Sequence, residues 1–313
     1  SLAFALCMNT LEIVAGIALL IKFPYKQTLW LLLGLIVFFT FLTFYSAYFD
    51  KVKDCGCFGD ALKLTPWESF TKDVVLLVLI LIIFYGRKYI KPIFNSFMTN
   101  IIATLSLVLS LAFGYHVLMH LPSIDFRAYK IGANLIENMS TPPNAPKAVQ
   151  EFTWTFDVNG TQQTFVTDGS YPAVDGTYVG VETEIIEEGF QPSILDFSIE
   201  SDQDDFTNYF LNQERLLMIV CYNLETANQQ GLQKLKSASD LALTKGYTVI
   251  GLSASGEEVK SRITTLYDLD FEFYICDEKA LKTVVRSNPG LLQLKSGTVQ
   301  QKVHWNDIDD LQL

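Results

Sequence analysis

Residues 28–49 read Thr-Leu-Trp-Leu-Leu-Leu-Gly-Leu-Ile-Val-Phe-Phe-Thr-Phe-Leu-Thr-Phe-Tyr-Ser-Ala-Tyr-Phe, without a single charged side chain. An α-helix needs about 20 mostly apolar residues to cross the hydrocarbon core of a bilayer. This stretch therefore predicts a membrane-spanning helix. Comparable apolar stretches lie before and after it, and the sequence predicts four spans at about residues 2–21, 28–49, 67–85 and 97–118.

The two ends of this membrane part carry further expectations. The chain starts with Ser inside an apolar stretch, so we expect another helix before residue 1 and five spans in all. The third span carries Glu68, Lys72 and Asp73 in its first two turns, and we expect that charged end to lie at the membrane interface. Four or more spans are too many for a cleaved signal peptide.

Charge separates the membrane part from the rest of the chain. Residues 1–120 carry 9 Lys and Arg against 6 Asp and Glu, a balance of +3, whereas residues 121–313 carry 14 against 28, a balance of −14. An acidic C-terminal part argues against nucleic acid as a partner, because phosphates require Lys and Arg. The sequence also lacks a nucleotide-binding loop, a hydrolase nucleophile motif and a zinc-protease helix.

Basic residues in the short links predict the orientation. Lys22 and Lys26 lie between the first and second spans, and residues 87–91 between the third and fourth contain three basic residues and no acid. The positive-inside rule places both links in the cytoplasm. We therefore expect an inner-membrane protein whose second loop and C-terminal part lie in the periplasm. The expected partners are the lipid bilayer and an extracytoplasmic or membrane protein.

The second loop contains Cys55-Gly56-Cys57-Phe58-Gly59-Asp60. Gly56 allows a tight backbone, and two Cys residues at this spacing can reach the Cα separation of a disulfide. Strained and exposed disulfides are easily reduced, so Cys55 and Cys57 are the candidate catalytic residues for thiol–disulfide chemistry. Two alternatives stay open: a structural disulfide in the loop, or a metal site with Asp60 that lacks a visible fourth ligand.

Glu12 lies near the middle of the first span, where an ionisable group is costly and usually functional. One interpretation makes Glu12 a proton relay during electron transfer to a membrane quinone, which is a candidate cofactor. The other makes it a neutral, hydrogen-bonded side chain that holds helices together. The sequence does not decide between them.

The chain after the membrane part changes its pattern twice. Residues 121–150 are predicted to form a connector, with a proline-rich spacer at 141–146. Residues 147–190 are predicted to form a small β-rich segment, because alternating runs flank Asn159-Gly160, a strong hairpin signal. We thus expect three parts, at 1–120, 121–190 and 191–313.

Buried strands alternate with helices in the last part, which predicts an α/β domain. Strands are expected at 216–222, 247–252 and 271–276, followed by two short strands about a Lys-Ser-Gly turn within 289–299. Helices are expected at about 227–245, 257–267 and 277–287.

Pro-Gly-Leu-Leu-Gln-Leu at 289–294 and Ser-Gly-Thr-Val at 296–299 resemble the end of a thioredoxin-like domain, in its TlpA and peroxiredoxin branches. The resemblance implies that Pro289 is a cis-proline at a binding site and that residues 195–199 form the first strand. It places Leu224-Glu225-Thr226-Ala227 where the family has its redox Cys-x-x-Cys, so this domain is expected to be redox-silent. Cys221 and Cys276 could form a disulfide or remain free thiols, and the sequence leaves both alternatives open.

Residues 1–95 resemble the DoxX/MauE family of small integral membrane proteins. The resemblance rests on Leu11-Glu12 with Gly16 in the first span, and on residues 54–60 with the helix that follows. It implies a helical bundle fused to an extracytoplasmic domain and a role near envelope redox chemistry. Two hypotheses follow: electron transfer through Cys55 and Cys57 at the outer face, or a non-catalytic envelope component whose thioredoxin-like domain binds a partner or packs in a larger complex.

Overall fold

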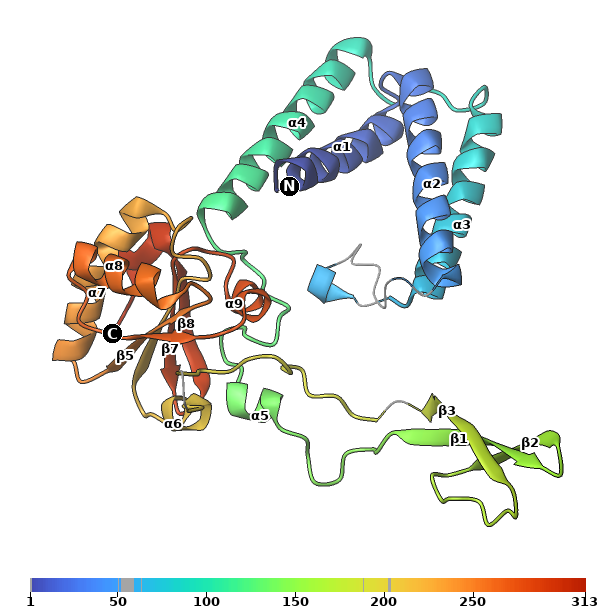
Figure 1. The fold of residues 1–313 in the computed structure, drawn as a ribbon. Coiled ribbons are helices and arrows are strands. Elements are labelled where there is room, and N and C mark those ends of the chain that lie inside the picture. The colour runs from blue at the N-terminus through green and yellow to red at the C-terminus, as the bar shows by residue number, and fades with distance from the viewer. Residues whose placement is uncertain (1, 50, 52–58, 63, 188, 202–203) are drawn as a thin grey trace. The chain divides into compact units, whose positions relative to one another are not determined.

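The computed structural model describes residues 2–49, 51, 59–62, 64–187, 189–201 and 204–313. The chain forms two compact units, residues 1–127 with 303–311 and residues 128–302 with 312–313. Figure 1 labels the helices and strands of both units.

The first unit contains four helices that are long and apolar enough to cross a membrane. They confirm the four predicted spans: α1 (Leu2–Ile21), α2 (Tyr25–Tyr48), α3 (Pro66–Gly86) and α4 (Ser96–Met119). Helix α2 packs against α3, and α1 packs against α4 and α2. Large apolar side chains such as Phe41 and Val78 point outward, as expected of helices that contact lipid. The protein is therefore a multi-pass membrane protein.

The start of α3 follows from its sequence. Thr65 accepts a hydrogen bond from the backbone N–H of Glu68, the Glu68 carboxylate accepts one from the backbone N–H of Thr65, and Pro66 occupies the first helical position. This reciprocal cap satisfies two backbone donors that a helix start otherwise leaves open. It fixes the point where the loop with the two Cys residues ends and the third span begins.

The second unit is built on a five-stranded sheet with the order β6-β5-β4-β7-β8. Its strands are β4 (Leu216–Val220), β5 (Thr248–Ser253), β6 (Phe273–Ile275), β7 (Gly290–Lys295) and β8 (Thr298–His304). Strand β4 runs parallel to β5 and antiparallel to β7, and all five of its residues are fully buried. The helices of this unit are α6 (Thr207–Leu211), α7 (Gln229–Thr244), α8 (Glu257–Tyr267) and α9 (Glu278–Val284). This strand order and direction confirm the predicted thioredoxin-like fold.

Part of the expected connector packs on this sheet. The Val299 backbone accepts a hydrogen bond from Gly132 and donates one to Ala133, so residues 132–135 lie along the beginning of β8. A short helix follows, α5 (Leu135–Met139), and the side chain of Leu135 is completely buried. Residues 128–140 therefore contribute to the α/β core, which the sequence pattern did not indicate.

The prediction of a strand at residues 195–199 is wrong. Phe197 and Ile199 are buried as a strand would require, but the segment forms no ladder. Glu200, the next residue, forms isolated antiparallel bridges with Asp205 and with Ile275 at the edge of β6. The apolar residues that suggested a strand serve instead to cover the core.

The predicted β-rich segment forms a separate three-stranded antiparallel sheet with the order β2-β1-β3. Its strands are β1 (Val149–Val158), β2 (Thr161–Thr167) and β3 (Thr177–Glu187). Asn159 and Gly160 both have positive φ angles, 55° and 77°, as the two-residue hairpin turn requires. Aromatic rings on one side of this sheet surround Phe156, which is 1% exposed.

Candidate functional site

The predicted catalytic residues Cys55 and Cys57 lie outside the described residues, so their role stays a prediction. The structure does describe the helices on both sides of their loop. Helix α2 ends at Tyr48 and α3 begins at Pro66, so both helices present the same end of the bundle to the loop. The polar groups near these two helix ends are the described part of the site.

A buried carboxylate lies at this end of the bundle. Asp73 is 3% exposed and accepts a hydrogen bond from Thr43 Oγ1 at 3.0 Å, across the α2–α3 contact. Lys72 Nζ lies 2.9 Å from its other oxygen. Asp73 is seven residues after the start of α3, and Thr43 is five residues before the end of α2. Both therefore lie about 7–10 Å from the helix ends that carry the Cys loop.

Ser69 lies one turn before Asp73 on α3, in the same buried contact. Its side chain is completely buried, and its hydroxyl has no hydrogen-bond partner among the described residues. A buried hydroxyl beside a buried acid makes this helix contact polar inside a membrane span, where such groups are usually functional. The expectation that this charged end of α3 lies at the membrane interface stays a prediction, and the structure adds that Asp73 faces α2.

Glu12, the predicted proton relay, is exposed on α1. The structure therefore does not bring it together with Asp73, which is buried between α2 and α3. Its role stays a prediction.

A cavity of about 490 Å³ lies among α1, α2 and α4. Apolar residues and the amides of Gln27 and Asn100 line it. Its α2 residues, Gln27, Thr28 and Leu31, belong to the first two turns of a helix that is 24 residues, or about 36 Å, long. The Cys loop follows the other end of α2. The cavity therefore lies near the end of α2 opposite to the one that the Cys loop follows, and quinone binding stays a prediction.

The dithiol position of the thioredoxin-like domain is closed by hydrogen bonds. Asn223 Oδ1 accepts from the backbone N–H groups of Glu225 and Thr226, at 3.0 and 3.1 Å. Ser255 Oγ accepts from the backbone N–H of Leu224 at 3.0 Å. The backbone N–H groups of residues 224–226 are therefore already satisfied. With no thiol among residues 224–227, this loop has no means of disulfide exchange.

The loop before β7 contacts the same region. The Asn288–Pro289 peptide bond is cis, and Asn288 Nδ2 donates a 2.7 Å hydrogen bond to the carbonyl of Asn223. Asn288 Oδ1 is buried without a partner among the described residues. Pro289 thus lies beside the loop that replaces the dithiol, and its role in binding stays a prediction.

The two cysteines of the α/β domain are free and buried. Burial raises the pKa of the Cys221 thiol far above its ordinary value and that of Cys276 to about 11. Thiolates are the reactive form of cysteine, so both side chains are unreactive at neutral pH. Cys221 and Cys276 are 0% and 1% exposed, and both are free thiols rather than a disulfide.

No three His, Cys, Asp or Glu side chains within the part of the chain that the structure describes come close enough to hold a metal ion. The alternative in which Cys55, Cys57 and Asp60 bind a metal falls largely outside the described residues and stays open.

The chain is similar to one family model and to several solved structures. Residues 1–86 match the family model described as methylamine utilisation protein MauE. The chain is similar to the solution structure of a thiol:disulfide interchange protein from a Bacteroides species, with 14% identity over 34% of this chain and 75% of that one and a TM-score of 0.27. It is also similar to apo Sco1 from Thermus thermophilus, with 14% identity over 36% and 84% and a TM-score of 0.28. Curated proteins give no match.

The family match and the sheet topology together define the class of protein. The chain joins a MauE-like helical membrane part to a thioredoxin-like α/β domain.

Proposed function

We propose that this chain is a membrane-bound thiol–disulfide exchange protein in which Cys55 and Cys57 cycle between dithiol and disulfide at the outer face of the inner membrane. The observation that carries the proposal is Asp73, a buried carboxylate in the helix that follows the Cys loop. Thiol chemistry requires a group that accepts the thiol proton, because the thiolate is the attacking species. Among the described acidic side chains that are buried, Asp73 is the one nearest in sequence to the Cys loop.

The reaction is an exchange with a disulfide of another protein. A thiolate of the pair attacks one sulfur of the partner disulfide, and the other partner sulfur leaves as a thiolate. The second thiolate of the pair then attacks the mixed disulfide, which forms the Cys55–Cys57 bond and releases the partner as a dithiol. The pair loses two electrons and the partner gains two. The two protons pass from the chain's thiols to the partner's sulfurs, and Asp73 holds each proton in transit.

The test is the redox state of the pair in cells, fixed by acid quench and read by a mass tag on free thiols. We expect a mixture of dithiol and disulfide in the unmodified protein. Cys55→Ser and Cys57→Ser should each trap a mixed disulfide with a partner protein. Cys7→Ser, which removes a free cysteine from α1, is the matched control and should leave these adducts unchanged.

Asp73→Asn tests the proton acceptor. We expect re-oxidation of the reduced pair to slow by about a hundredfold, the lower end of general acid–base contributions. Thr43→Val removes only the hydroxyl that hydrogen-bonds to Asp73 and should have a smaller effect. A pair that stays fully oxidised and gives no adduct in either serine variant would overturn the exchange function. Unchanged kinetics in Asp73→Asn would remove Asp73 from it.

A second candidate function is partner binding by the α/β domain. The observation that favours it is the replacement of the dithiol by Leu224-Glu225-Thr226-Ala227 on an otherwise intact thioredoxin-like sheet. A domain that keeps its fold without its chemistry is suited to hold a partner near the membrane. In that case the adducts above are absent, while a partner still co-purifies with the chain.

A further inference from the structure

One edge of the five-stranded sheet is open. Strand β6 is the last strand on its side of the sheet. The Gly251 N–H donates a 2.8 Å hydrogen bond to the carbonyl of Glu272, the residue before β6, so the backbone groups of the even-numbered residues point toward β5. Backbone groups alternate in direction along a strand, so the backbone N–H and C=O groups of Phe273 and Ile275 point away from β5. Ile275 exchanges two hydrogen bonds with Glu200, at 2.7 and 3.0 Å. Beyond this single bridge, the described chain adds no strand to the outer side of β6.

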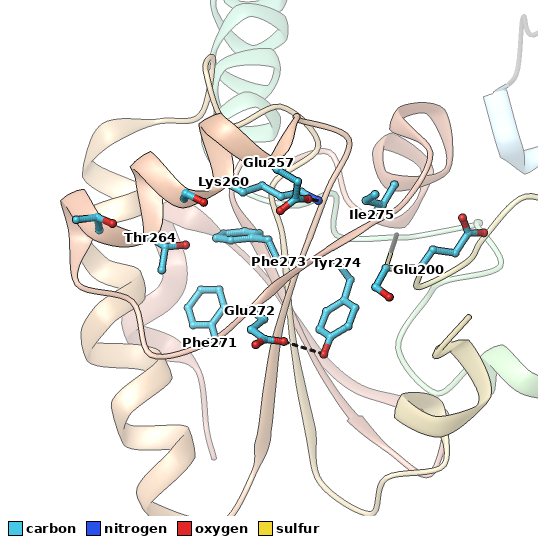
Figure 2. A pocket seen from close by; sticks show the side chains of 12 residues that line it. Glu200, Glu257, Lys260, Thr264, Phe271, Glu272, Phe273, Tyr274 and Ile275 are labelled. Atoms are coloured by element: carbon cyan, nitrogen blue, oxygen red, sulfur yellow. Dashed lines mark hydrogen bonds and ion pairs between the residues drawn. The ribbon is translucent and has the colours of Figure 1, made fainter. Parts of the chain in front are cut away.

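A cavity of about 450 Å³ adjoins this edge. Helix α8 contributes Glu257 and Lys260 from above, and Figure 2 shows the ring of Phe273 below them. Residues 271–275 line the cavity along β6, and Glu200 and Ser201 line it where the single bridge begins. An extended segment that continued this bridge toward Phe273 would therefore run through the cavity.

The charge of this cavity selects its occupant. Lys260 is the only basic residue that lines it, and its Nζ lies 2.6 Å from Glu257 Oε1, so the two charges offset each other. Glu200 and Glu272 remain, and no lining cation opposes them. Glu272 accepts a hydrogen bond from Tyr274 Oη at 3.2 Å, drawn as a dashed line in Figure 2. Two carboxylates beside an open strand favour a basic segment.

We infer that the β6 edge is a docking site for an extended, basic segment of another protein, which adds a strand beside Phe273 and places Lys or Arg side chains near Glu200 and Glu272. Strand addition supplies affinity through main-chain hydrogen bonds, while side-chain pockets supply specificity. A second copy of the α/β unit is a poor occupant, because residues 121–313 carry 28 acidic against 14 basic residues. The inference gives a location and a partner chemistry to the second candidate function, and it does not depend on Cys55 or Cys57.

The test uses the full chain in zwitterionic detergent and a fluorescent ten-residue peptide of alternating Lys and Val. Two peptides serve as controls: one with Glu in place of Lys, and one of unchanged charge in which two central residues are Pro. We expect the Lys peptide to bind, the Glu peptide not to bind, and the Pro peptide to bind at least tenfold more weakly because Pro cannot donate a ladder hydrogen bond.

Variants of the chain locate the site. Glu200→Gln with Glu272→Gln should weaken binding of the Lys peptide at least tenfold. Glu214→Gln, an acid outside this cavity, is the matched control and should leave binding unchanged. Hydrogen exchange at residues 271–275 should slow when the peptide binds. Equal binding of the Lys and Pro peptides, or unchanged binding by the double variant, would overturn the inference. These results are separate from the thiol adducts, so either proposal can fail alone.

Discussion

Thr43 on α2 donates a 3.0 Å hydrogen bond to the carboxylate of Asp73 on α3, and both side chains are buried. The bond joins two helices that the Cys loop connects in sequence. Lipid tails offer no hydrogen-bond partners, but the Thr43 hydroxyl also lies 3.0 and 3.2 Å from the Phe39 and Thr40 carbonyl oxygens of its own helix. The bond to Asp73 is the one that links α2 to α3, and it favours one rotation of α3 against α2.

The first prediction concerns the stability of this helix pair. Thr43→Val keeps the shape of the side chain and removes the donor, so it should lower the free energy of unfolding by roughly 0.5–2 kcal/mol. Titration with a denaturing detergent, followed by circular dichroism, measures this change. Thr40→Val is the control, because Thr40 hydrogen-bonds only within α2, to the Ile36 carbonyl. Equal losses in the two variants would contradict a specific role for the bond to Asp73.

The second prediction concerns alkaline pH. The Cys276 thiol has an ordinary pKa of 9.0, and burial raises it to about 11 in the folded domain. Between these values the unfolded chain has lost a proton that the folded chain keeps, so rising pH favours unfolding. The contribution approaches about 1.4 kcal/mol per pH unit for one proton. Cys276→Ala should therefore lose less stability than the unmodified chain between pH 9 and 11 in denaturant titrations. Cys7→Ser should behave as the unmodified chain does.

The third prediction concerns the segment before the small sheet. Leu135 is completely buried, so Leu135→Ala should lower the free energy of unfolding by about 2–5 kcal/mol. Ile131 lies four residues earlier and is 60% exposed, so Ile131→Ala should change it by less than about 0.5 kcal/mol. Chemical denaturation monitored by circular dichroism compares the two. A small loss in Leu135→Ala would show that residues 132–135 contribute little to the α/β core.

The fourth prediction concerns the floor of the β6 cavity. Gly251 on β5 leaves room for the ring of Phe273, and a Cβ atom at this position would overlap that ring. Gly251→Ala should therefore displace Phe273 and cost about 1–3 kcal/mol, as overpacking usually does. Gly180→Ala is the matched control in a strand, since a Cβ there meets no atom within 4 Å. Thermal unfolding of the two variants should differ, and equal midpoints would contradict the close contact.

Much of the fold could be predicted because it depends on continuous patterns. The four spans are long apolar runs, and β4 is a short apolar run that ends up buried on both faces. The hairpin at Asn159-Gly160 depends on two adjacent residues that accept positive φ angles. Features of this kind are local, and the sequence displays them directly.

The remainder depends on contacts between distant residues. Tyr129 and Leu135 are buried against the sheet, but neither belongs to a periodic pattern. The burial of Asp73 follows from the face that α3 turns toward α2, which the sequence of α3 alone does not show. Residues 195–199 have the composition of a strand, yet a strand requires a partner, and only Glu200 finds one. Each of these outcomes is decided by packing that a single sequence does not encode locally.

The aromatic cluster of the small sheet has a practical consequence. Trp154 donates a hydrogen bond to Thr167 Oγ1 at 2.9 Å and packs edge-on against Tyr171. The other tryptophans, Trp30, Trp67 and Trp305, all lie outside this sheet. A chain that keeps only Trp154 would therefore have a fluorescence signal from this sheet alone. Its emission during heating would reveal whether the sheet melts separately from the α/β domain that it interrupts.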